Sequence, residues 1–85
     1  MLEGDLVLFG CLSDFEAQLG GRWSASVSET TIEALLSDFV ARAPEMSDIV
    51  NSPYFKVAIN NKVQPKTFTL EHGDTVALLP PVTGG

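Results

Sequence analysis

The alternation of apolar and polar positions divides the chain into short extended segments around one helix. Six extended segments are predicted, at residues 6–9, 23–27, 54–59, 62–64, 68–70 and 75–79. The first is apolar at every position, which indicates a central strand covered on both sides. Asn60 and Asn61 suit a tight hairpin turn, because Asn tolerates positive φ. Pro65 keeps the strand before it short or at a sheet edge.

One amphipathic helix is predicted over residues 32–43, where apolar side chains recur at helical spacing. The stripe consists of Ile32, Leu35, Leu36, Phe39, Val40 and Ala43. Thr30 and Glu33 form a capping-box pair at its start, and Pro44 ends it. This stripe is expected to pack on the sheet as core.

The remaining segments carry weaker signals. Residues 13–20 suit a short helix that the glycines at 20–21 would stop. Residues 45–53 are expected to form a loop, and residues 71–74 a turn in which His72 is solvated. One main helix against one mixed sheet gives a two-layer α+β domain.

The first and last strands each carry two apolar faces, whereas the helix can cover only one. Their alternating sets are Leu6 with Leu8, Val7 with Phe9, Val76 with Leu78, and Ala77 with Leu79. One set of each strand must therefore point away from the helix, and such a hydrophobic patch commonly marks a protein interface. Period two alone does not say which set faces outward, and a loop over the second face is the alternative.

Composition and charge bound the classes of function. The 85 residues suffice for one small domain, and no apolar run approaches the roughly 20 residues of a membrane span. The N-terminus lacks the features of a secretory signal, so a cytoplasmic location without membrane contact is expected. The net charge of −6 argues against nucleic-acid binding. It fits a basic protein partner, or merely keeps a small protein in solution.

The chain offers little chemistry of its own. Cys11 follows an apolar run and is expected to be a buried, inert thiol. One cysteine and one histidine, His72, fall short of a zinc site, so no metal is expected. No nucleophile–base pair and no phosphate-cradling loop is evident, which disfavours a free-standing enzyme.

A six-residue tail is predicted to follow a domain of residues 1–79. It consists of Pro80, Pro81, Val82, Thr83, Gly84 and Gly85. The prolines end the strand's hydrogen bonding and hold the root extended, and the two β-branched residues favour an extended course. The glycines have no side chains and can thread a narrow channel. At about 3.3 Å per residue the tail reaches roughly 20 Å. A disordered tail or a cloning remnant is the alternative.

These motifs together resemble a known family. Gly73-Asp74, the apolar strand after it, and the tail ending in Gly84-Gly85 resemble the end of a MoaD-type sulfur carrier, the small subunit of molybdopterin synthase. The hairpin at residues 57–61 is similar to that of the same ThiS/MoaD family. The resemblance implies a ubiquitin-like β-grasp fold, in which the first and last strands are parallel and adjacent at the centre of the sheet.

The resemblance also implies a chemistry. An E1-like enzyme uses ATP to adenylate the carboxylate of Gly85, and a sulfur donor of the cysteine desulfurase or rhodanese type converts the acyl-adenylate into a thiocarboxylate. The tail then enters the large subunit of the synthase, in a heterotetramer, where sulfur adds to the cyclic pyranopterin precursor and builds the molybdopterin dithiolene. The chain itself binds no cofactor.

The resemblance further implies docking on the large subunit through Phe9, Val63 and Leu79. Phe9 belongs to the set of Val7 on the first strand, and Leu79 to the set of Ala77 on the last strand. The resemblance therefore favours these two sets as the ones that face outward. Two alternatives stay open. One is a carrier for another product, such as thiazole or a thiolated nucleoside of tRNA. The other is a ubiquitin-like modifier that forms isopeptide bonds to lysines.

Overall fold

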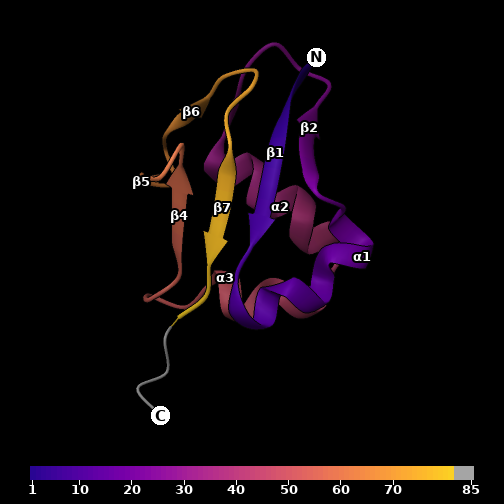
Figure 1. Cartoon of the computed structure of the whole chain (residues 1–85), viewed down its shortest axis with the longest axis vertical. Helices are drawn as coiled ribbons and strands as arrows, with labels where there is room; N and C mark the ends of the chain where they lie inside the picture. Colours follow the sequence, from indigo (N-terminus) through magenta and orange to yellow (C-terminus); the bar gives the residue numbers. More distant parts are fainter. Residues whose placement is uncertain (82–85) are drawn as a thin grey trace.

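A five-stranded mixed sheet forms one layer of the structure, and the helices form the other (Figure 1). The structure is a computed structural model, and it describes residues 1–81. In spatial order the strands are β2 (Arg22–Ala25), β1 (Leu2–Leu8), β7 (Val76–Leu79), β4 (Lys56–Ile59) and β5 (Lys62–Val63). The central pair, β1 and β7, is parallel, and the other pairs are antiparallel. The first and last strands therefore lie side by side, which confirms the expected β-grasp arrangement.

The second layer is built around α2 (Ile32–Arg42), which lies behind the sheet in Figure 1. The shorter helices are the 3-10 helices η1 (Gly10–Phe15) and η2 (Pro44–Met46), and the α-helices α1 (Glu16–Leu19) and α3 (Ser47–Val50). A two-stranded sheet of β3 (Thr30–Thr31) and β6 (Thr69–Leu70) completes the fold. The α+β class is confirmed.

The core fills the space between the sheet and α2. It contains the stripe predicted for the helix, with Ile32, Leu35, Leu36 and Phe39 at most 3% exposed. Its largest fully buried side chains are Trp23, Phe39, Leu12, Ile32, Met46, Leu78 and Val76. Burial of these apolar side chains is the main favourable term for a domain of this size.

The start of α2 differs from the predicted capping box by one residue. Thr31 is the N-cap, and its hydroxyl oxygen accepts a hydrogen bond from the backbone N–H of Ala34 at 3.2 Å. Thr30 is instead buried and paired with Leu70 in the small sheet. The sequence signal located the start of the helix to within one residue but did not reveal β3, which comprises Thr30 and Thr31.

Two local predictions at the short helices are wrong. Residues 45–53 were expected to be a loop, but η2 and α3 occupy most of that range, because Met46, Ile49 and Val50 follow helical spacing and reach the core. Cys11 is exposed, not buried. It lies in η1, whose buried residue is its neighbour Leu12.

Other local predictions hold, with shifted boundaries. Asn60 and Asn61 have φ values of 52° and 72°, so the hairpin turn is confirmed, and β5 is a two-residue edge strand. The short helix predicted over residues 13–20 begins earlier, with η1. It ends at Gly20, where φ is 74°. The strand predicted over residues 23–27 ends at Ala25.

Candidate docking face and tail root

The sheet turns one apolar face away from the helices. Leu6, Val76 and Leu78 point toward α2 and are at most 6% exposed. The alternate positions Val7 and Phe9 are 38% and 48% exposed. Residues 1–81 therefore cover β1 on one side only, and the expectation of a strand covered on both sides is wrong. The outward set is the one that contains Val7 and Phe9.

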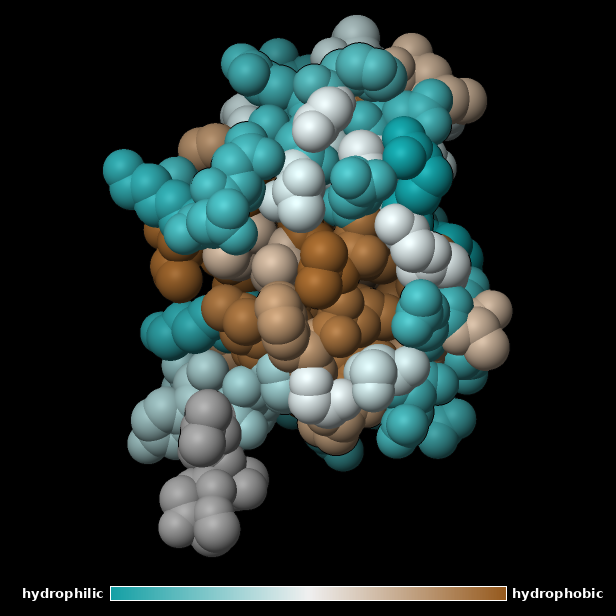
Figure 2. Space-filling view, viewed as in Figure 1, coloured by the Kyte–Doolittle hydropathy of each residue, from teal (hydrophilic) through white to brown (hydrophobic). Residues whose placement is uncertain are grey.

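The strand register extends this set across the sheet. Val63 pairs with Ala58, Ala58 with Ala77, and Ala77 with Val7, so these four side chains form one row on the same face. In the next row Leu79 pairs with Lys56. We call the side of the five-stranded sheet that faces away from α2 the outer face. Figure 2 shows a continuous hydrophobic patch at its centre.

The three predicted interface residues lie together on or beside the outer face. Phe9 continues the ladder beyond β1, with its backbone N–H donating to the carbonyl of Leu78 at 3.2 Å. Val63 is 56% exposed, and Leu79 is half-buried. The structure thus places the three residues on the same side of the sheet. Their contact with a partner stays a prediction.

The tail begins at the end of the outer face, where β7 ends at Leu79. Pro80 and Pro81 are half-buried. Gly10 has φ of +56°, and a Cβ atom there would lie 3.0 Å from Cγ of Pro80, so a glycine permits this close approach. The root of the tail therefore packs on the segment that follows β1. Val82, Thr83, Gly84 and Gly85 lie outside the described residues, and the division into a domain and a tail stays a prediction.

A polar cluster fixes the other end of β7. Asp74 is buried, and its carboxylate accepts hydrogen bonds from the side-chain amide of Asn60 at 3.0 Å and the backbone N–H of Glu71 at 2.8 Å. Its backbone carbonyl accepts from the indole N–H of Trp23 at 2.7 Å. Gly73 has φ of +91°, and its N–H donates to the carbonyl of Glu3 at 2.7 Å.

This cluster gives the Gly73-Asp74 motif a physical role. It ties the start of β7 to β1, β2 and β4, so that the strand enters the sheet in a fixed register. The hydrogen bond from Trp23 to this motif is not among the sequence predictions. The indole itself is the one sequence signal for it, because a buried indole N–H usually has a hydrogen-bond partner.

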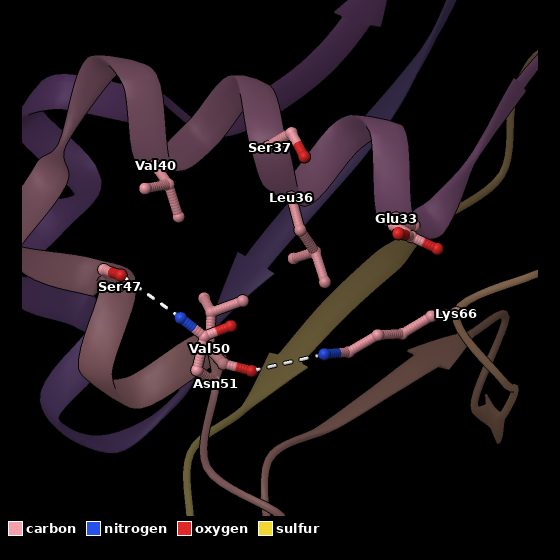
Figure 3. Close-up of a pocket in the computed structure, with 8 residues that line it drawn as sticks. All are labelled: Glu33, Leu36, Ser37, Val40, Ser47, Val50, Asn51 and Lys66. Carbon is pink, nitrogen blue, oxygen red and sulfur yellow. Dashed lines mark hydrogen bonds between the residues drawn. The ribbon is translucent and has the colours of Figure 1, made fainter.

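A hollow on the helical side of the sheet has no comparable chemistry (Figure 3). Its volume is about 410 Å³, and it lies between α2, α3 and Lys66. Three of its polar side chains form hydrogen bonds within the domain: Asn51 donates to the hydroxyl of Ser47, and the ammonium of Lys66 to the carbonyl of Val50. Its lining consists of Glu33, Leu36, Ser37, Val40, Ser47, Val50, Asn51 and Lys66.

Comparison with known protein families identifies the family of the chain. The model of the ThiS family matches residues 14–85. The chain belongs to the ThiS family. The resemblance to the ThiS/MoaD ubiquitin-like carriers is thereby confirmed. Members of this family are small carrier proteins, which agrees with a non-catalytic role. None of the curated proteins matches the chain in sequence.

Solved structures share the fold of this ThiS-family protein. SAMP1 from Haloferax volcanii is 23% identical, with a TM-score of 0.71 over 98% of this chain and 99% of that one. The HVO 2177 protein from Haloferax volcanii is 22% identical, with a TM-score of 0.81 over 99% and 87%. A putative molybdopterin converting factor, subunit 1, from Pyrococcus furiosus is 18% identical, with a TM-score of 0.73 over 96% and 100%. At these identities the likeness concerns the fold.

Two further observations concern the part of this ThiS-family protein that the structure describes. None of its helices is long and apolar enough to cross a membrane. Residues 1–81 contain no group of three or more His, Cys, Asp or Glu side chains placed to hold a metal ion.

Proposed function

We propose that this ThiS-family protein is the sulfur-carrier subunit of a molybdopterin synthase, and that Gly85 carries the sulfur. One observation supports the proposal above others. The central strand β7 is held at its start by the cluster around Asp74, and it leads directly into the Pro-Pro-Val-Thr-Gly-Gly segment beside an apolar face. The fold shared with a putative molybdopterin converting factor subunit agrees with this role.

The chemistry requires activation, because a carboxylate is a poor electrophile. In the proposed first step the Gly85 carboxylate attacks the α-phosphorus of ATP, and pyrophosphate leaves. In the second, the terminal sulfur of the donor's cysteine persulfide attacks the carbonyl carbon of the acyl-adenylate, the C–O bond to AMP breaks, and an acyl disulfide forms. A second thiol then attacks the donor cysteine's sulfur, the S–S bond breaks, and the thiocarboxylate is released while the two thiols become a disulfide. The sulfur of the thiocarboxylate then attacks the cyclic pyranopterin precursor on the way to the dithiolene. Hydrolysis of the acyl–sulfur bond returns the carboxylate.

In this scheme the residues of the chain position the Gly85 carbonyl in the active sites of its partners. The glycines at the tip let the carbonyl approach a nucleotide closely, since they present no side chain. The prolines at the root restrict φ and limit the entropy lost when a partner binds the tail. The apolar side chains of Phe9, Val63 and Leu79 supply contact area beside the root.

The proposal names three partners. They are an E1-like adenylating enzyme that uses ATP, a sulfur donor of the cysteine desulfurase or rhodanese type, and the large subunit of the synthase in a heterotetramer. The carrier itself binds no cofactor or metal in this scheme, and it acts in the cytoplasm. The first two partners act on Gly85 in turn, and the third receives the tail with its sulfur.

Mass spectrometry tests the proposal directly. The purified chain is incubated with the adenylating enzyme of its source organism, ATP and a sulfur donor, and its intact mass is measured. We expect the gain that replacement of one oxygen by sulfur produces, at the C-terminal residue, and only with ATP. Transfer is then tested by adding the large subunit with the pyranopterin precursor. An unchanged mass under all conditions would contradict the proposal.

A protein modifier is the second candidate, because a structure titled small archaeal modifier protein 1 shares this fold with a TM-score of 0.72 at 21% identity. In that role the activated Gly85 carbonyl is attacked by a lysine amine of a target protein and forms an isopeptide bond. The two functions leave different products. A branched Gly-Gly remnant on lysines of other proteins, found by peptide mass spectrometry, would support the modifier.

A further inference from the structure

The charges of the molecule are distributed unevenly between the outer face and the rest. Four charged side chains occupy outer-face positions of the five-stranded sheet: Glu3, Asp5, Arg22 and Lys56. Two carboxylates therefore balance two cations there. Of the eleven acidic and five basic residues in the chain, nine acidic and three basic ones lie elsewhere. The sheet positions of the outer face are thus neutral in sum, and the net charge of −6 is carried by residues at other positions.

Three of the four outer-face charges form one ion-pair cluster, with a net charge of −1, far from the tail. Arg22 donates to the carboxylate of Asp5 at 3.0 Å and to that of Glu3 at 3.3 Å. These residues lie where β1 begins, and the tail leaves β7 at the opposite end of the parallel pair. The end of the outer face next to the tail is left with apolar side chains and Lys56.

Lys56 stands directly beside the root of the tail. It is the cross-strand partner of Leu79, the last residue of β7, and its side chain is exposed. It forms no ion pair with any residue of the range 1–81. An exposed lysine beside an apolar patch can bury its aliphatic stem along that patch while its ammonium stays at the rim.

From this distribution we infer that the outer face fits a partner surface that is apolar and carries a carboxylate opposite Lys56, not a basic surface. The net charge of the chain suggested a basic partner, but the outer-face positions of the sheet do not carry that charge. The inference rests on the proposed function, because it describes the surface of the enzyme that receives the tail. In the complex the carboxylate pairs with Lys56 at the edge of an apolar contact and fixes the orientation of the carrier.

A charge-reversal pair tests the inference. Lys56→Glu is compared with Lys62→Glu, which changes the net charge equally. Lys62 lies on the neighbouring strand β5 but pairs with Ile59, a core residue, so it occupies the opposite side of the sheet. The affinity of each variant for the synthase large subunit of the source organism is measured by calorimetry. We expect Lys56→Glu to weaken this binding by tenfold or more, and Lys62→Glu by less than about twofold.

A second variant distinguishes this inference from the alternative that a basic partner is attracted by the negative charge of the helical layer. Glu45→Gln with Asp48→Asn removes two negative charges from the helical layer. We expect no change in affinity beyond about twofold, since these residues lie away from the outer face. Weaker binding by this double variant, or equal effects of the two lysine reversals, would overturn the inference.

Measuring thiocarboxylation of the wild-type chain alongside these affinities tests the proposed function separately from the inference. Thiocarboxylation of the wild-type chain with equal effects of the two lysine reversals would overturn the inference alone. A selective effect of Lys56→Glu on binding, without thiocarboxylation of the wild type, would support the inference and contradict the sulfur-carrier function. Absence of wild-type binding to the large subunit would overturn both.

Discussion

The indole nitrogen of Trp23 lies 2.7 Å from the backbone carbonyl oxygen of Asp74 and donates a hydrogen bond to it across 51 positions of sequence. Both groups are buried. This bond joins the edge strand β2 to a residue two positions before the last strand, β7. Correct placement of the tail root therefore depends on a residue that no sequence motif connects with it.

Replacement of Trp23 by Phe tests this bond. The variant leaves the Asp74 carbonyl buried without its donor and removes part of a fully buried side chain. We expect the free energy of unfolding to fall by about 2–4 kcal/mol, measured by urea denaturation. Thiocarboxylation at a temperature where the variant is folded should persist, because Trp23 contacts the residues before β7, at the opposite end of that strand from the root of the tail. A stability change below about 0.5 kcal/mol would show that the bond contributes little.

Gly4 and Gly21 provide a matched pair of alanine substitutions. A Cβ atom at Gly4 would overlap the carbonyl oxygen of Asp74 and the indole nitrogen of Trp23, whereas one at Gly21 has no neighbour within 4 Å. We expect Gly4→Ala to destabilise the fold by about 2 kcal/mol or more, because neither neighbour can move without breaking their hydrogen bond. Gly21→Ala should change stability by less than about 0.5 kcal/mol. Thermal unfolding of both variants measures this difference. Equal melting temperatures would contradict the packing described around Asp74.

Phe9 tests the outer face without disturbing the core. Its side chain is 48% exposed, so Phe9→Ser should alter the free energy of unfolding by no more than about 1 kcal/mol. Binding to the synthase large subunit should weaken by about tenfold or more, as expected for an aromatic side chain in an interface. Tyr54→Ser serves as control, because Tyr54 is also an exposed aromatic residue but precedes β4 and is not one of the three predicted interface residues. Equal losses for both variants would argue against this face as the docking site.

The end of the tail tests the proposed chemistry. Deletion of Gly85, or addition of one residue after it, should abolish thiocarboxylation, because the activated carboxylate is then displaced or replaced. The fold should persist, with an unchanged circular dichroism spectrum and melting temperature, since the described core involves residues 1–81 only. Normal thiocarboxylation of either variant would disprove the role of Gly85.

Signals from repeated, local patterns predicted the architecture well. The apolar stripe of α2 and the paired asparagines at 60–61 act within a few residues, so the sequence alone locates them. The outward set on β1 required a resemblance, because a strand apolar at every position has no periodicity that distinguishes its faces.

Features that depend on distant partners were missed. Thr30 and Thr31 are chemically equivalent as caps, and the sequence does not show that the helix begins after Thr31, the end of a short strand paired with β6. Cys11 is exposed because Leu12 occupies the core beside it. The contribution of Trp23 depends on Asp74, far away in sequence. Each of these depends on a tertiary neighbour, which composition and spacing do not show.

The central position of β7 has a mechanical consequence. The strand is hydrogen-bonded to β1 on one side and to β4 on the other, and the tail extends from its end. A force that pulls on the tail, for example when the tail leaves a narrow channel, acts parallel to β7 and shears both rows of hydrogen bonds. These bonds must then break together and not one after another, so the domain resists the force as a unit. The carrier can thus be withdrawn from a partner by its tail and remain folded.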